Sequence, residues 1–115
     1  METYRLVLPE DLNQFGYLFG GRLLSWIDEA CWIAASLDYP DCRFVTIGMD
    51  EVEFRHSVRE GTILSILCEQ SAKGTTSVQY EVSVRRGKVA SGEPVFSTRV
   101  TYVNVDAEGL SLIHI

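Results

Sequence analysis

The stretch LPEDLNQFGYLFGGRLLSWIDEA, residues 8–30, decides how the rest of the chain folds. From about Arg22 to about Asp38, apolar residues recur every three or four positions, which predicts one long amphipathic helix. The recurring positions are Leu23, Leu24, Ile27, Cys31, Ala34, Ala35 and Leu37. Pro40 ends the helix, because proline cannot continue the hydrogen-bonded ladder. We expect an irregular, glycine-containing loop over residues 10–21 before the helix.

Gly20 and Gly21 lie directly before the expected helix. The first backbone N–H groups of a helix have no partner inside it, and glycine lets a ligand approach them closely. Together with the positive end of the helix dipole, these donors suit a carbonyl oxygen that develops negative charge. The plainer interpretation is that the two glycines only make a tight turn, and the pair alone does not decide between the two.

Asp28 is the helix residue that most needs an explanation. It lies at the margin of the apolar stripe, whereas its neighbour Glu29 is better placed to face solvent. A carboxylate is costly to bury unless it is paired or used chemically. Asp28 is therefore either a boundary residue or the general base or nucleophile of a hydrolytic site.

After Arg43 the pattern changes to that of β-strands. Four strands are predicted, separated by turns near Gly61, Gly74 and Gly87, and they span residues 44–54, 62–71, 77–85 and 95–105. A short strand over residues 3–8 precedes the loop. The second of the four has apolar residues on both faces, so we expect it in the middle of the sheet. The order predicts a single α+β domain over residues 1–115, with one helix and a five-stranded antiparallel sheet.

This architecture predicts a dimer. One helix covers only part of one face of a five-stranded sheet, and a chain of 115 residues buries a modest fraction of its surface alone. We expect the remaining apolar surface to be buried in a two-fold dimer or a higher assembly of dimers.

The candidate site leads to the same expectation. Gly21 and Asp28 are roughly 10 Å apart along a helix that rises about 1.5 Å per residue. A base and an oxyanion donor must both lie within about 3 Å of one reacting centre. One helix can hardly supply both, but the glycine amides of one subunit and the partner's Asp28 can meet. The predicted dimer and the predicted site are thus one hypothesis.

The composition excludes several classes of protein. Hydrophobic residues make up 46% and charged residues 23% of the chain, as in ordinary soluble domains. Sixteen acidic and ten basic residues give a net charge of −6, which argues against nucleic-acid binding. No stretch is long and apolar enough for a membrane span or a secretory signal, and the three cysteines lack the spacing of a metal site or disulfide framework. We expect a cytoplasmic protein without membrane contact, metal or cofactor.

The segment 9–30 resembles the signature of hotdog-fold acyl-CoA thioesterases, P-x-D-x-N-x-x-G-x-x-F-G-G followed by a helix with a central Asp. The similarity is to the branch of YciA-like and brain-type cytosolic acyl-CoA hydrolases. Later pieces of the family pattern follow in order, and they are Phe44-Val45-Thr46, Val52-Glu53-Phe54, Val58-x-x-Gly61 and Gly74-Thr75-Thr76-Ser77-Val78. The resemblance covers roughly residues 6–106. It implies a hotdog fold, in which the sheet wraps a long central helix, and hydrolysis of acyl-CoA to a free acid and coenzyme A.

The resemblance also implies roles for individual residues. Asp28 would be the catalytic carboxylate, Asn13 would hold the substrate or the attacking water, and Gly20 and Gly21 would line the thioester carbonyl. The residues implied or predicted to bind substrate are Phe19, Arg59, Lys73, Gly74, Thr75, Thr76 and Ser77. For Asn13 a role as a turn former, and for residues 74–77 a plain hairpin turn, are the alternatives. The homodimer is expected to assemble further into a tetramer or hexamer.

Two other functions are weighed against hydrolysis. A non-catalytic acyl-ligand sensor on the same fold would typically carry a separate DNA-binding segment, and the acidic charge also disfavours it. A hydratase would need a histidine in the pocket, and we expect neither His56 nor His114 near the helix. The chain departs from the family at His56-Ser57-Val58, at Thr62 and over residues 110–115, which leaves the preferred acyl length open.

Overall fold

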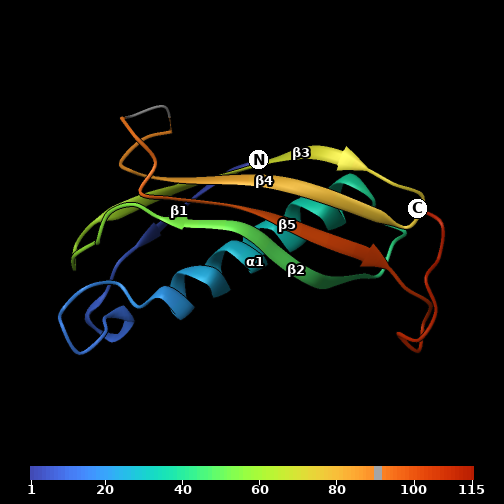
Figure 1. The fold of residues 1–115 in the computed structure, drawn as a ribbon, viewed down its shortest axis with the longest axis horizontal. Coiled ribbons are helices and arrows are strands. Elements are labelled where there is room, and N and C mark those ends of the chain that lie inside the picture. The colour runs from blue at the N-terminus through green and yellow to red at the C-terminus, as the bar shows by residue number, and fades with distance from the viewer. Residues whose placement is uncertain (90–91) are drawn as a thin grey trace.

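One α-helix lies against one face of a curved five-stranded antiparallel sheet in the computed structural model, which describes residues 1–89 and 92–115 (Figure 1). The chain runs through β1 (Glu2–Leu6), a short 3-10 turn (Pro9–Asp11), α1 (Gly20–Asp38), β2 (Phe44–Phe54), β3 (Ile63–Lys73), β4 (Ser77–Arg86) and β5 (Phe96–Asn104). The predicted fold class and element order are therefore confirmed.

The strands lie in the order β1-β3-β4-β5-β2. The segment with apolar residues on both faces, β3, lies between β1 and β4, so it is an interior strand as its pattern predicted, but the middle strand of the five is β4. The two edges differ in length, because β1 has five residues and β2 has eleven. The long edge strand β2 leaves a row of backbone groups without a neighbouring strand in this chain, which is a template for pairing with another chain.

The helix begins earlier than predicted. Gly20 and Gly21 form its first turn instead of preceding it, and Phe19 is the residue that caps it. Glycine is a poor helix former, which is why the pattern placed the start at Arg22. The first turn closes all the same, because the Phe19 carbonyl accepts the N–H groups of Arg22 at 3.0 Å and Leu23 at 3.2 Å.

The core lies between α1 and the inner face of the sheet. The helix buries a stripe that is partly made of small residues, namely Leu23, Trp26, Ile27, Ala30, Cys31, Ala34 and Ala35. Small side chains let the helix approach the sheet closely. Cys31 and Cys68 are both buried, with 3.1 Å between their sulfurs, which confirms the prediction that they act as small core residues.

Apolar side chains remain exposed on the flank of α1 and along β2. On the helix they are Trp32, Ile33 and Leu37, and on the strand they are Val45, Ile47 and Val52. Exposed apolar groups gathered on neighbouring elements are typical of an interface. The two-fold dimer stays a prediction, and this surface is where we expect it to form. Across the described residues, no helix is sufficiently long and apolar to traverse a membrane.

Ile27→Ala should destabilise the domain by about 2–5 kcal/mol, because Ile27 is fully buried between helix and sheet and its loss leaves a cavity. Urea unfolding followed by circular dichroism measures the change. Ser25→Ala, at an exposed position of the same helix, should stay within about 0.5 kcal/mol. A loss below about 1 kcal/mol for Ile27→Ala would contradict the packing described here.

Candidate active site

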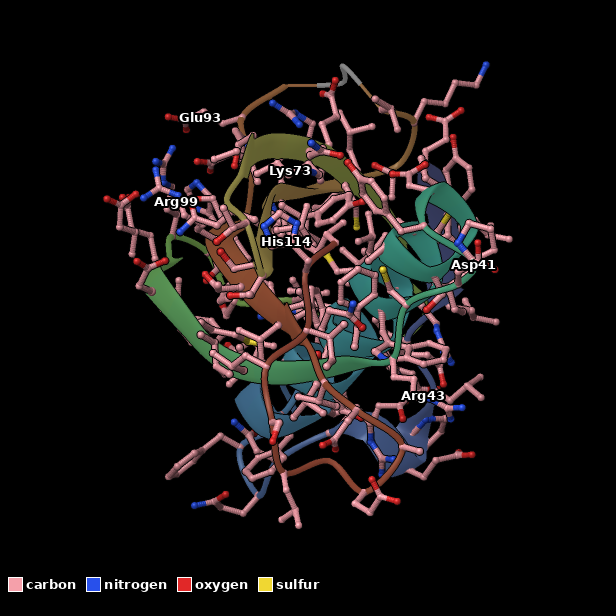
Figure 2. The ribbon with its side chains drawn as sticks, turned by 90° about the vertical axis from the view of Figure 1, so that its right-hand side faces the viewer. Asp41, Arg43, Lys73, Glu93, Arg99 and His114 are labelled. Carbon is pink, nitrogen blue, oxygen red and sulfur yellow. The ribbon has the colours of Figure 1, made fainter. Side chains whose placement is uncertain are left out.

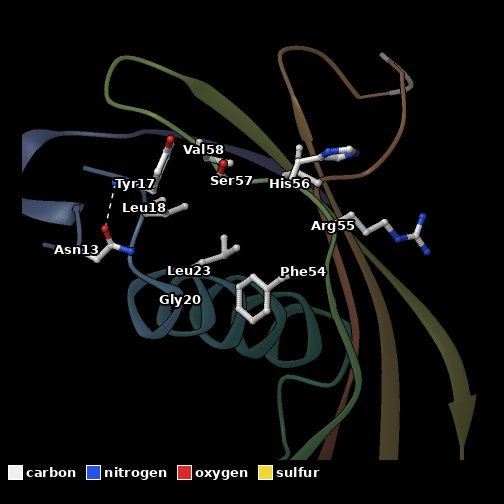
Figure 3. A pocket seen from close by; sticks show the side chains of 11 residues that line it. Asn13, Tyr17, Leu18, Gly20, Leu23, Phe54, Arg55, His56, Ser57 and Val58 are labelled. Carbon is white, nitrogen blue, oxygen red and sulfur yellow. Dashed lines mark hydrogen bonds between the residues drawn. The ribbon is translucent and has the colours of Figure 1, made fainter. Parts of the chain in front are cut away.

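A cavity of about 440 Å³ opens at the start of α1, between the preceding loop and the segment that follows β2 (Figure 3). Its lining residues come from both segments and from the residue before β5, and they are Asn13, Tyr17, Leu18, Gly20, Leu23, Phe54, Arg55, His56, Ser57, Val58 and Val95. The loop over residues 12–19 therefore forms one wall, as expected from its glycines and Asn13. Two of the predicted catalytic residues, Asn13 and Gly20, lie in this cavity.

Asp11 holds that loop against the helix. Its buried carboxylate accepts the Leu8 N–H at 2.9 Å and lies 3.2 Å from the Arg22 guanidinium, while its carbonyl accepts the Phe19 N–H at 2.8 Å. Asp11 thus links the start of the loop, the residue that caps α1 and the first helical turn. It is the Asp of the signature, but no local pattern in the sequence predicts its structural role.

Asn13 shapes the loop with one side-chain atom and leaves the other free. Its Oδ1 accepts the backbone N–H groups of Phe15 at 2.9 Å and Tyr17 at 3.1 Å, which makes it the turn former considered as an alternative. Its Nδ2 has no hydrogen-bond partner among residues 1–89 and 92–115. In Figure 3 this atom points away from Tyr17, toward the start of the helix. Asn13 is therefore a turn former that still presents an amide donor to the cavity.

The N–H groups of Gly20 and Gly21 have no acceptor in the described part of the chain, because the first N–H groups of a helix have no carbonyl partner inside it. Both glycines are closely covered by aromatic rings. A Cβ on Gly20 would lie 3.2 Å from the Phe54 ring, and one on Gly21 would lie 2.9 Å from the Phe19 ring. The absence of side chains here lets the rings pack over the helix start, where two free donors and the helix dipole favour negative charge.

The rim of the cavity carries basic residues. Arg59 pairs with Tyr17 through an isolated β-bridge, and its guanidinium lies 5.4 Å from the centre of the Tyr17 ring. Arg55 lines the cavity and is paired with Glu53 at 2.9 Å. Of the predicted substrate-binding residues, Arg59 and Phe19 do not line the cavity, but they adjoin the lining residues Tyr17 and Gly20. Positive charge at the mouth suits a ligand with phosphate groups.

The expectation that His56 lies away from the helix is wrong. His56 lines the same cavity as Gly20, because β2 ends at Phe54 and the following residues cross over the helix start. Its side chain is exposed, lies 3.6 Å from the Glu93 carboxylate and points away from Gly20 in Figure 3. His114 lies at the far end of the molecule (Figure 2).

Asp28 lies at the middle of α1, half-buried beside β5 and β2. Its Oδ1 accepts two hydrogen bonds, from the Thr46 hydroxyl at 2.8 Å and from the Tyr102 hydroxyl at 2.9 Å. Its Oδ2 has no partner among the described residues, so it is the oxygen available to a ligand. Asp28 does not line the cavity at the helix start.

Tyr102 is a residue of this constellation that the sequence analysis missed. It was counted only as part of the last strand, and its spacing from Asp28 carries no local pattern. Burial, first of all, raises the pKa of the Tyr102 phenol well above its ordinary value, and the neighbouring Cys31 and Asp28 add to this. The phenol is therefore a hydrogen-bond donor throughout the neutral range.

The remaining predicted substrate-binding residues lie far from the cavity. Residues 73–77 form the hairpin between β3 and β4, where the Gly74 N–H donates to the Ser77 carbonyl at 2.8 Å. This hairpin lies beside the end of β5, whereas the cavity includes Val95 just before β5 begins. The nine residues of β5, at about 3.3 Å each, therefore separate the hairpin from the cavity by roughly 30 Å. Lys73 accordingly lies at the end of the molecule that faces the viewer in Figure 2.

One chain therefore does not bring the predicted site together. Asn13, Gly20, Phe19 and Arg59 gather at one end of the helix, Asp28 lies at its middle, and the hairpin lies at the far end of the sheet. Within the described ranges, no three His, Cys, Asp or Glu side chains gather as a metal site would need. Metal-free and cofactor-free chemistry stays a prediction.

Comparison with known proteins finds a match to the thioesterase superfamily family model over residues 15–93. The chain is similar to the acyl-CoA thioester hydrolase YciA of Escherichia coli, with 35% identity over 109 residues that cover 90% of this chain and 82% of that protein.

Solved structures of thioesterases are also similar to this chain. A hexameric hotdog-fold thioesterase of Campylobacter jejuni has a TM-score of 0.84 and 37% identity over 98% of this chain and 88% of its own. An acyl-CoA hydrolase of Staphylococcus aureus, solved with butyryl coenzyme A and coenzyme A, has a TM-score of 0.87 and 30% identity over 99% of this chain and 70% of its own. Variants of the staphylococcal enzyme with an aspartate, an asparagine or a threonine changed to alanine have also been solved.

The two roles of Asn13 predict different behaviour for two variants. Asn13→Asp keeps an oxygen that accepts the Phe15 and Tyr17 N–H groups, whereas Asn13→Ala removes it. The amides of Phe15 and Tyr17 should therefore exchange roughly fivefold faster in Asn13→Ala, as expected for a loss of about 1 kcal/mol, and near the wild-type rate in Asn13→Asp. Hydrogen exchange by NMR measures both. Equal rates in the two variants would contradict the turn-forming role.

Proposed function

The chain belongs to the thioesterase superfamily, and from this we propose that it hydrolyses acyl-CoA thioesters to a free acid and coenzyme A. It has the hotdog fold expected from its sequence. The proposal for the reaction is supported by the names of its relatives and by one observation above all. Asp28 is held at the helix–sheet junction with one carboxylate oxygen bonded and the other free.

In the proposed mechanism, Asp28 acts as a general base through Oδ2. It takes a proton from water, whose oxygen attacks the thioester carbonyl, and the resulting oxyanion accepts the N–H groups of Gly20 and Gly21. Collapse of the tetrahedral intermediate breaks the C–S bond, and the coenzyme A thiolate leaves and takes up a proton. The Asn13 Nδ2 orients the water or the carbonyl. No metal or cofactor takes part, since coenzyme A is half of the substrate.

We propose that the complete site forms between two subunits. Asp28 lies seven residues, or roughly 10 Å, beyond Gly21, which is too far for both to reach one carbonyl. Thr46, which bonds Asp28, belongs to the exposed edge strand β2, so a partner seated on that edge comes close to the carboxylate. The helix start of one subunit then meets the partner's Asp28. Relatives described as hexameric support assembly beyond the dimer.

The same assembly accounts for the two distant groups of substrate-binding residues. Arg59 and Phe19 lie next to residues that line the cavity, and we propose that they contact a phosphate and the substrate there. Residues 73–77 reach the coenzyme A moiety from another subunit, because within one chain the hairpin lies at the opposite end of the sheet. Cytoplasmic location stays a prediction from sequence.

The first test is turnover of a panel of acyl-CoA substrates by the purified protein. Asp28→Asn keeps the size of the side chain and removes the base, so kcat should fall by about 100-fold or more. Loss of thioester absorbance is the readout, since the three cysteines of the protein would react with thiol reagents. Glu29→Gln, at the neighbouring exposed position, is the matched control and should retain full activity. An inactive wild-type protein that binds acyl-CoA would support the sensor alternative.

Subunit complementation tests the shared site. Asp28→Asn and Asn13→Asp should each be inactive, because each removes one half of every site. When the two are unfolded and refolded together, half of the dimers are mixed and each has one intact site, so about a quarter of the wild-type activity should return.

A mixture that stays inactive, although mass measurements show mixed dimers, would mean that each subunit builds its own site. A monomeric mass at micromolar concentration would contradict the dimer itself.

A further inference from the structure

Tyr102 makes an unusual pair of contacts with Asp28. Its hydroxyl lies 2.9 Å from the Asp28 Oδ1 and 2.9 Å from the Asp28 backbone carbonyl oxygen. A phenol has one hydrogen, so this donor is shared between two acceptors on the same residue. A single group thereby fixes the backbone and the side chain of Asp28 with respect to each other.

The ring of Tyr102 is itself held rigidly. The side chain is fully buried, with its centroid 6.2 Å from that of Phe44 and 6.4 Å from that of Tyr80. Burial raises the pKa of the phenol, so the hydroxyl stays protonated and cannot become an anion beside the carboxylate. Tyr102 is therefore a fixed, permanent donor from β5 to the middle of α1.

Thr46, from β2, is the second residue that donates a hydrogen bond to the Asp28 carboxylate. Its hydroxyl donates to the same Oδ1 at 2.8 Å, so β5 and β2 both hold one carboxylate oxygen. With Oδ1 bonded twice, the rotation of the carboxyl group is restricted and Oδ2 is the free oxygen. A base needs its reacting atom within hydrogen-bond reach of the water it activates, and small misplacements are costly in rate.

We propose that Tyr102 is a positioning residue for hydrolysis: by bonding both the Oδ1 and the carbonyl of Asp28, it aims Oδ2 at the substrate. The inference rests on the proposed function and deepens it. Tyr102 touches neither substrate nor water. It acts on the rate through Asp28, and the stability it gives the core is a separate effect.

The chain offers a matched control in Tyr80. This tyrosine is also almost fully buried on the inner face of the sheet, and its hydroxyl donates to an aspartate of α1, Asp38, at 2.6 Å. Asp38 is the last residue of the helix, far from Asp28. Tyr→Phe at either position removes one buried hydroxyl from one tyrosine–aspartate pair and leaves the ring in place. The two variants should lose similar stability but differ in activity.

Three other titratable groups surround this pair. Cys31 from α1 and Cys68 from β3 lie near Tyr102, and Tyr80 from β4 packs against its ring. The hydrogen bond with Cys68, first of all, raises the pKa of the Cys31 thiol, and the same bond lowers the pKa of the Cys68 thiol. Burial raises the pKa of Tyr80.

The experiment compares Tyr102→Phe, Tyr80→Phe and wild-type protein in kcat and KM. Tyr102→Phe should lower kcat roughly 10- to 100-fold with little change in KM, since a misaimed base slows chemistry and leaves binding alone. Tyr80→Phe should keep the wild-type kcat. Thr46→Val, which removes the other donor, should behave like Tyr102→Phe.

Each outcome decides the question. If Tyr102→Phe keeps the wild-type kcat, or if Tyr80→Phe loses as much activity as Tyr102→Phe, the positioning role is wrong while the hydrolase function stands. If the wild-type protein does not hydrolyse any acyl-CoA, the proposed function fails and this inference falls with it. Thermal unfolding of all variants shows that activity is compared between folded proteins.

Discussion

The stiffness of a single helix is the constraint on which the rest of the structure depends. α1 carries two groups of chemical interest, the free N–H groups of its first turn and the carboxylate of Asp28. The fixed rise of the helix keeps them roughly 10 Å apart. A flexible loop could bend to bring donor and base together, but a helix packed along its length on a sheet cannot. Under the proposed hydrolysis, the geometry of one reacting carbonyl therefore requires more than one copy of that helix. Assembly and catalysis are then the same requirement.

The packing of the helix explains why Asp28 is where it is. Ala30, Cys31, Ala34 and Ala35 bring the second half of α1 close to the sheet, so that a hydroxyl from β5 can reach both the backbone and the carboxylate of Asp28. A larger residue at Cys31 would push the helix outward and break that contact. The apolar core and the polar site are thus parts of one arrangement: close packing places the donors, and the donors offset the cost of half-burying a carboxylate.

Much of the fold and part of the candidate site could be predicted from the sequence. The features that could not be predicted have physical reasons for this. The periodicity predicted the helix, the five strands and the interior position of β3, because burial imposes a repeat of 3.6 residues on helices and 2 residues on strands, and the local sequence shows this repeat. It misplaced the helix start, because the Phe19 carbonyl, rather than a capping side chain, closes the turn over two glycines. Tyr102 was missed because its partner lies 74 positions away, and only the folding of β5 against α1 brings them together. The structural role of Asp11 and the position of His56 were not predicted for the same reason, since loops that cross the helix start have no sequence repeat.

The distribution of charge adds a further argument for a shared site. Coenzyme A carries several phosphate charges, and a protein with a net charge of −6 repels it unless basic groups are gathered locally. In one chain the positive groups lie in separate places, with Arg55 and Arg59 at the cavity and Lys73 with Arg43 at the far end of the sheet (Figure 2). Neither group alone covers a ligand as long as acyl-CoA. In the proposed assembly, the far end of one subunit lies near the helix start of another, and the separate basic groups then form one binding surface. An acidic surface elsewhere repels a polyanion, so that proposed junction is the favourable place for coenzyme A to bind.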